Sequence, residues 1–104
     1  VTIVTVSGDI TLNKGGDAIL KDKVQSVLQQ GRKEILVDLA GVSYVDSAGL
    51  GELVQAYATT KNRGGTLKLV GVTKRLKDLL VVTKLLTVFD TFDDEASALA
   101  SFIA

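Results

Sequence analysis

The sequence predicts a layered α/β fold, in which helices pack on a single, mostly parallel sheet of four to five strands. Two observations predict it. Short runs of β-branched and apolar residues alternate along the chain with segments whose apolar residues recur at helical spacing. After an opening hairpin, this alternation favours parallel strands joined by right-handed helical crossovers. We expect one domain that spans residues 1–104 and contains about four helices.

The expected strands are short runs that end at turn residues. Residues 2–6 form the first run, and the turn dipeptide Ser7–Gly8 separates it from a second run at 9–12, so the chain is expected to open with a hairpin. Residues 34–39 form a compact apolar run, which is typical of a strand buried on both faces. Further strands are expected at residues 66–72 and, shorter and more exposed, at 87–92.

Four helices are expected between and after these strands. The first has Asp17 as its N-cap and stops at Gly31, and the second covers residues 48–63 and stops at Gly64–Gly65. Leu76, Leu79 and Leu80 indicate a third helix, and the acidic residues 93–95 lie at the start of the last one, where they favour the helix dipole. The side chains expected to face the core are Ile19, Leu20, Val24, Val27, Leu28, Leu50, Leu53, Val54, Tyr57, Leu76, Leu79, Leu80, Phe89, Phe92, Leu99 and Ile103.

The composition excludes several kinds of chemistry. The chain has no histidine and no cysteine, so it lacks the commonest general base, the commonest transition-metal ligands and any disulfide. Its twelve basic and twelve acidic residues cancel, and Lys74, Arg75 and Lys77 are interpreted as a solvated helix start rather than a site. No apolar run is long enough to span a bilayer. We therefore expect a cytoplasmic protein with no cofactor, no metal, no nucleic-acid partner and no insertion into a membrane.

The stretch YVDSAGLGEL, residues 44–53, places an acid–serine pair and two glycines at the start of a predicted helix. Glycine in a helix interior costs about 1 kcal/mol relative to alanine, so its presence needs a reason. As a cap, Asp46 or Ser47 accepts a hydrogen bond from the first turn, and the glycines let the helix lie close to the sheet. As a nucleophile, Ser47 lacks a histidine base and the first glycine of a G-x-S-x-G elbow, where Val45 stands.

A third interpretation makes Ser47 a switch. Free N–H groups and the positive dipole end at a helix start stabilise a phosphate, which would add about −1.5 to −2 charges. The small residues Ala48, Gly49 and Gly51 would then keep the hydroxyl open and let the backbone of another protein approach. The residue pattern leaves capping and switching both open.

Residues 35–72 resemble the core of the STAS domain, the anti-sigma factor antagonist family. The shared pattern is a buried strand that ends in Asp38–Leu39, a short hydrophobic link, and then D-S-x-G-L-G at residues 46–51, which opens a helix. A Gly-Gly turn and a strand with Leu-x-Leu-x-Gly follow. The segments GDI at 8–10 and FDDEASAL at 92–99 also fit, so the resemblance covers essentially the whole chain.

This resemblance implies a four- to five-stranded sheet flanked by helices, and partner switching. The unphosphorylated domain would bind an anti-sigma factor with serine kinase activity, and phosphorylation by that partner would break the complex. It implies that Ser47 is the phosphoacceptor and that Asp46 orients the site or contacts the partner. The docking surface would comprise Asp46, Ser47, Ala48, Gly49, Leu50 and Gly51; Ala48 stands where many members have a second serine.

An alternative is a constitutive STAS subunit or scaffold in a transporter or stress-signalling assembly, without phosphorylation. The retained Asp46–Ser47 pair favours the switch, because transporter tails in the family often lack the serine. We therefore expect a bacterial, non-enzymatic regulator of transcription. An exposed sheet edge would also allow a weak homodimer.

Overall fold

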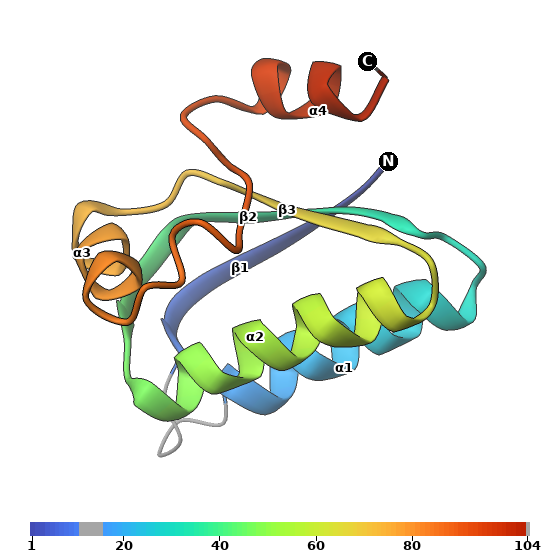
Figure 1. Ribbon diagram of the computed structural model, residues 1–104. Coiled ribbons are helices and arrows are strands. Elements are labelled where there is room, and N and C mark those ends of the chain that lie inside the picture. Colours follow the sequence, from blue (N-terminus) through green and yellow to red (C-terminus); the bar gives the residue numbers. More distant parts are fainter. Residues whose placement is uncertain (11–15, 104) are drawn as a thin grey trace.

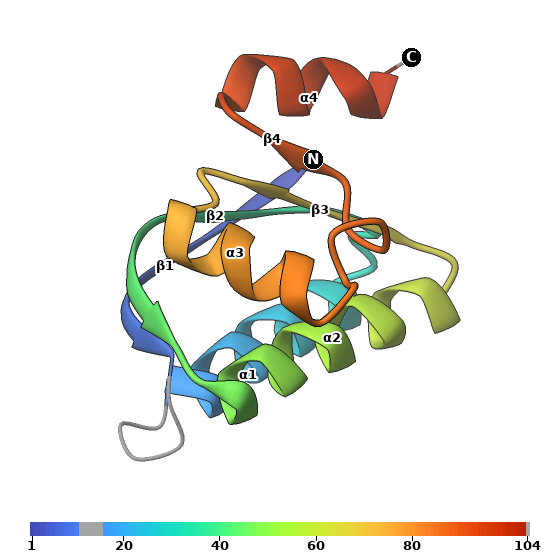
Figure 2. The ribbon, with the colours of Figure 1, turned by 60° about the vertical axis from the view of Figure 1, so that its left-hand side comes forward.

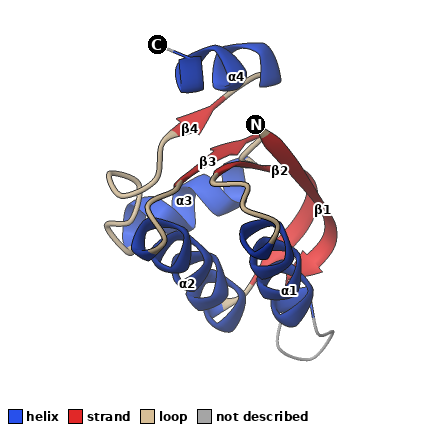
Figure 3. Cartoon of the chain, turned by 90° about the vertical axis from the view of Figure 1, so that its right-hand side faces the viewer, coloured by secondary structure: helices blue, strands red, loops and turns tan. Residues whose placement is uncertain are grey.

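The computed structural model describes residues 1–10 and 16–103, without the side chains of residues 7–10, 16–19, 21, 43, 47 and 48. Its sheet has four parallel strands in the order β1–β2–β3–β4 (Figure 1). Helices α1 and α2 cover one face of this sheet and α4 lies on the other (Figure 3). The elements are β1 (Thr2–Ile10), α1 (Gly16–Gln29), β2 (Glu34–Val45), α2 (Ser47–Asn62), β3 (Thr66–Val70), α3 (Lys74–Val82), β4 (Thr91–Phe92) and α4 (Glu95–Ile103). The predicted parallel α/β class is confirmed.

Two apolar clusters lie on the two faces of the sheet. Because side chains alternate along a strand, Ile35 and Val37 of β2 point into the main cluster, whereas Leu36 points into a smaller one under α4. The predicted burial of this strand on both faces is therefore confirmed. The other members of the main cluster that the sequence predicted are Leu20, Val24, Leu28, Leu50, Leu53, Leu76, Leu80 and Phe89.

The expected opening hairpin is wrong in the described residues. Strand β1 continues through Ser7–Gly8 to Ile10, with irregularities in its register beside these two residues. The reason is the length of β2, which continues to Val45 and offers β1 a parallel partner along its whole length. A ladder of this length outweighs the local turn preference of a Ser-Gly dipeptide. The end of the expected second strand, residues 11–12, lies outside the described residues.

The helices end at the glycines that the sequence predicted, but the predicted start of α1 differs from the observed one. Gly31 and Gly64 have φ values of 80° and 76°, the left-handed conformation that favours glycine after a helix. Helix α1 begins at Gly16, so Asp17 lies inside its first turn and the predicted N-cap is wrong. The predicted burial of Ile103 is also wrong, since this residue is 86% exposed.

Helix α4 covers the second face through a stripe that excludes Ile103. Ala98 is buried there, and the partly buried Leu99 and Phe102 pack beside it at the spacing of one helix face. Lys68 of β3 donates hydrogen bonds to the Oγ and carbonyl oxygen of Ser101, with N···O distances of 2.8 and 3.3 Å. Residue 103 lies about 140° around the helix from the buried Ala98, beyond Leu99 and off the buried stripe.

Asp94 caps α4. Its carboxylate accepts hydrogen bonds from the N–H and the Oγ–H of Ser97, at 2.7 and 3.0 Å, and these bonds lower the pKa of the carboxyl group. A lowered pKa means that the ionised form stabilises the fold at neutral pH. That contribution is lost as the pH falls through the lowered value.

Candidate functional site

Asp46 and Ser47 lie between the carboxyl end of β2 and the first turn of α2. Asp46 has an extended backbone, with φ −91° and ψ −178°, and Ser47 is the first residue of the helix. Helix α3 begins shortly after the carboxyl end of the neighbouring strand β3, so both helix starts lie at the same edge of the sheet (Figure 1). This is the edge at which sites on parallel sheets are expected.

The carboxylate of Asp46 is the N-cap of α2. The N–H of Gly49 donates a hydrogen bond to Oδ1 of Asp46 over 2.7 Å, and the N–H of Leu50 donates to its backbone oxygen over 2.9 Å. Of the acid–serine pair, Asp46 is therefore the residue that caps α2. Ser47 follows the cap, and its side chain lies outside the described part of the chain.

Replacement of Asp46 by alanine is expected to lower the free energy of unfolding by about 1 kcal/mol, because one free N–H of the first turn loses its acceptor. Asp46→Asn is the matched control, since its amide oxygen can still accept from the N–H of Gly49. Urea denaturation of the purified variants measures both. An alanine variant as stable as the parent protein would contradict the capping role.

The structure separates the predicted docking residues into exposed and buried ones. Gly51 is exposed and Asp46 is half-buried, whereas Gly49 is buried. Leu50 is 6% exposed and packs in the main cluster, so its side chain is absent from the surface on which it was expected. It points inward because it lies three residues before Leu53, on the same face of α2. The side chains of Ser47 and Ala48 lie outside the part of the chain that the structure describes.

Among the described residues, no neighbour requires a glycine at position 51. Apart from its two chain neighbours and the nearby backbone of α2, a Cβ added there would meet no heavy atom of the described residues within 4 Å. The expectation that this glycine lets the helix lie close to the sheet is therefore wrong for Gly51. What the glycine does provide is open space beside the first turns of α2, at about 1 kcal/mol in helix propensity.

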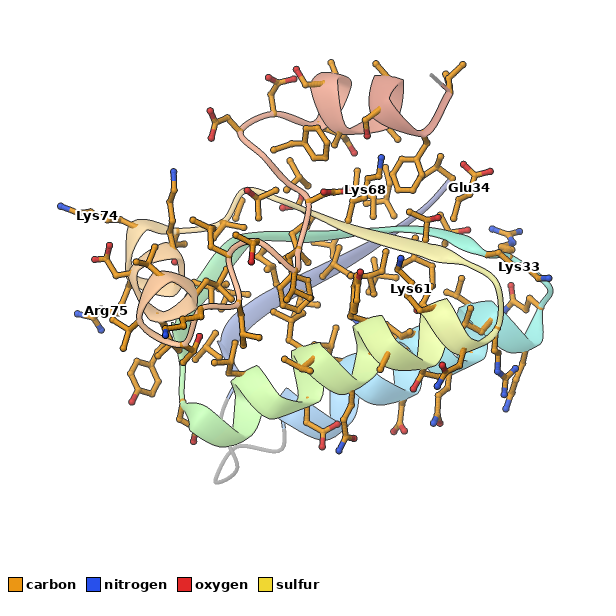
Figure 4. All side chains as sticks on the ribbon, in the orientation of Figure 1. Lys33, Glu34, Lys61, Lys68, Lys74 and Arg75 are labelled. Carbon is orange, nitrogen blue, oxygen red and sulfur yellow. The ribbon has the colours of Figure 1, made fainter. Side chains whose placement is uncertain are left out.

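Tyr44 and Arg75 border the same surface, and sequence reasoning missed both. Tyr44, at the end of β2, is 45% exposed. It lines a small hollow together with Thr73 and Arg75 from the start of α3. Lys74 and Arg75 extend from α3 at the end of the molecule where α2 begins (Figure 4). Tyr44 lies at the carboxyl end of β2, and Arg75 lies shortly after the carboxyl end of β3. Knowledge that these two strands are neighbours would have marked both residues as candidates for the site.

The described residues contain no group of three or more His, Cys, Asp or Glu side chains that could hold a metal ion. Across the same ranges, no helix is both long enough and apolar enough to cross a membrane. The described part of the site is therefore an acid-capped helix start with an exposed glycine, and an aromatic and a cationic side chain lie by the strand end that precedes it. Such a surface suits contact with another protein.

The architecture is a layered α/β domain in which the acid-capped start of α2 lies at the carboxyl edge of the parallel sheet. A family model described as "Mlab, STAS domain" matches residues 1–89, and the chain belongs to this family. The chain is 33% identical over 87 residues to the anti-sigma-B factor antagonist of Bacillus subtilis, which covers 84% of this chain and 77% of the relative. The resemblance inferred from residues 35–72 is confirmed.

Solved structures share the fold. The chain is similar to a candidate anti-sigma factor antagonist from Thermotoga maritima, with a TM-score of 0.85, 22% identity, and coverage of 95% of this chain and 84% of that one. It is also similar to a sulfate transporter family protein from Wolinella succinogenes, with a TM-score of 0.77, 23% identity, and coverage of 95% and 81%. The phosphorylated form of SpoIIAA from Bacillus gives a TM-score of 0.72 at 15% identity, with coverage of 96% and 88%.

Proposed function

We propose that this chain is a single-domain, cytoplasmic anti-sigma factor antagonist that acts by partner switching, without catalytic turnover. It binds an anti-sigma factor with serine kinase activity while Ser47 is unphosphorylated, and it is released when that partner phosphorylates Ser47. The observation that most directly supports this proposal is the open space at Gly51, one turn beyond Ser47. The relative named as an anti-sigma-B factor antagonist supports the class of partner.

The switch is electrostatic. A neutral hydroxyl at position 47 is tolerated in an interface from which water is excluded, whereas a phosphate of about −1.5 to −2 charges must lose its hydration there. The added charge is also one residue from the carboxylate of Asp46, and repulsion between two like charges strengthens where an interface excludes water. In the free domain, water and the positive end of the α2 dipole stabilise the phosphate. Phosphorylation therefore stabilises the released state relative to the complex.

Replacement of Gly51 by alanine is expected to affect stability and binding in opposite directions. The free energy of unfolding should rise by up to about 1 kcal/mol, because alanine is the better helix former and its Cβ enters open space. Partner affinity should fall at least about tenfold, because the methyl group occupies the space into which the partner backbone packs. Urea denaturation and isothermal titration with the anti-sigma factor measure the two effects.

The matched control is Ala100→Gly, an exposed change of the opposite kind in α4, on the other face of the sheet. It should lower stability by a similar amount and leave partner affinity unchanged. Equal partner affinity for Gly51→Ala and the parent protein would show that the space beside Gly51 is unused.

The proposal itself is tested by incubating the domain with candidate anti-sigma kinases and ATP, followed by mapping of the phosphosite by mass spectrometry. We expect one phosphate, on Ser47, and no labelling of Ser47→Ala. The proposal fails if no cognate kinase labels Ser47 and Ser47→Asp leaves partner affinity unchanged.

The second candidate is a constitutive subunit or scaffold of a transporter or stress-signalling assembly. The similarity to a sulfate transporter family protein favours it. On this account the same face binds its partner permanently, so Ser47→Ala, Ser47→Asp and the parent protein would bind equally. Neighbouring transporter genes in the native host would support this candidate, whereas a neighbouring kinase-type anti-sigma factor would support the switch.

A further inference from the structure

The outward face of α3 combines cationic and apolar side chains. Leu76 and Leu80 point into the main cluster, which leaves the opposite face of this nine-residue helix in solvent (Figure 2). Two adjacent valines lie on that outer side near the helix end, Val81 at 55% exposure and Val82 at 78%. Exposed apolar residues that adjoin each other are a feature of interaction surfaces.

The same segment is strongly basic in a protein whose formal net charge is zero. Residues 74–84 contain Lys74, Arg75, Lys77 and Lys84 but only one carboxylate, Asp78. All five are exposed, and among the described residues no carboxylate lies within 4.0 Å of any of the four cationic groups. These charges are therefore available to an acidic partner.

Lys84 occupies a backbone position that favours glycine. Its φ is 62°, and it follows α3 in a Schellman turn, in which the N–H of Leu85 donates to the carbonyl oxygen of Leu80 over 2.8 Å. A lysine in this left-handed conformation is disfavoured relative to glycine. The lysine side chain nevertheless stands here, and with Val81, Leu86 and Thr87 it lines a hollow of about 270 Å³. A cation at the rim of an apolar hollow fits an acidic residue next to an apolar one.

We propose that the outer face of α3 binds an acidic segment of a protein partner. An apolar side chain of that segment seats in the hollow beside Val81, and its carboxylates lie against Lys74, Lys77 and Lys84. That this partner is the anti-sigma factor rests on the proposed function. Tyr44 and Arg75 line one hollow between the end of β2 and the start of α3, so the start of α3 adjoins the strand end that precedes α2.

Binding to an anionic membrane uses similar chemistry, but the face of α3 suits it less. Asp78 lies on the same face as the lysines and valines, where an anionic bilayer would repel it. Two valines also offer little apolar area to insert, and the face carries no aromatic side chain. Asp78 can instead pair with a cationic side chain of a protein partner.

The test is an NMR titration of the ¹⁵N-labelled domain with a synthetic helix-forming peptide that carries glutamates and leucines on one face. We expect saturable shifts confined to residues 74–87 that weaken as salt rises, and none with a lysine-for-glutamate version of the peptide.

Lys77→Glu and Val82→Ser should each raise the dissociation constant at least about fivefold. The control Lys33→Glu, at the opposite end of the molecule, should not change it (Figure 4). Shifts scattered over the surface, or equal affinities for all variants, would overturn the inference, as would pelleting of the domain with anionic vesicles but no response to the peptide.

A second measurement separates this inference from the proposed function. With the anti-sigma factor that labels Ser47, Lys77→Glu should slow association about tenfold at low salt, while phosphorylation of Ser47 still breaks the complex. If Lys77→Glu associates at the parent rate and phosphorylation still breaks the complex, the inference about α3 is overturned and the proposed function stands. An absence of any effect of phosphorylation would instead overturn the proposed function.

Discussion

Replacement of Ser47 by aspartate is expected to weaken binding of the anti-sigma factor at least about 100-fold, equivalent to about 2.7 kcal/mol. The new carboxylate must lose water at the interface beside Asp46, and an unpaired charge in such a place costs at least this much. Isothermal titration against the anti-sigma factor with ADP, which prevents phosphate transfer, measures the affinity.

Two controls separate this charge effect from damage to the fold. Ser47→Ala should keep the parent affinity and lose only the ability to be labelled, because no charge is added. Ser47→Asp should unfold at the same denaturant concentration as the parent protein or slightly above it, since an acid in the first turn of α2 is favourable. If Ser47→Asp binds as tightly as Ser47→Ala, charge at this position does not control docking.

Replacement of Gly65 by alanine is expected to lower the free energy of unfolding by about 2–3 kcal/mol. An added Cβ would lie 2.5 Å from the backbone oxygen of Lys33 and 2.9 Å from Cγ2 of Thr60. The same Lys33 oxygen accepts the hydrogen bond from the N–H of Thr66, over 2.8 Å, that joins the starts of β2 and β3. Relief of the contact must move backbone at this junction, and urea denaturation measures the loss.

Gly51→Ala is the internal comparison for Gly65→Ala, because the same chemical change there enters open space and should stabilise the protein. Gly65→Ala should leave the partner affinity of the folded molecules unchanged. Residue 65 comes just after the C-terminal end of α2, whereas Ser47 lies at its N-terminal end. A loss of stability below about 0.5 kcal/mol would mean that the strand junction adjusts more freely than its contacts indicate.

The parts of the fold that depend on local chemistry were predictable from sequence. Gly31 and Gly64 terminate helices because glycine adopts a left-handed backbone readily, and the apolar spacing of α2 placed Leu53 correctly in the core. The opening hairpin failed because the partner of β1 is distant in sequence. Only the long pairing of β1 with β2 shows why Ser7–Gly8 does not form a turn.

The candidate site was predicted in place but not in detail. The motif located the boundary between β2 and α2, yet it did not distinguish Asp46 from Ser47 as the cap. That choice depends on the exact first residue of α2, which local pattern defines poorly. For Leu50, the helical spacing correctly predicted a core position, whereas the family resemblance had also counted it in the docking surface. The proximity of Tyr44 and Arg75 depends on the pairing of β2 with β3, which no local signal specifies.

The most direct measurement compares the affinity of the anti-sigma factor for the domain carrying phosphoserine at position 47 with its affinity for the unmodified domain, by isothermal titration with ADP. The phosphorylated form should bind at least about 100-fold more weakly, while both forms unfold at similar denaturant concentrations. Equal affinities for the two forms would contradict control of docking by charge at the start of α2.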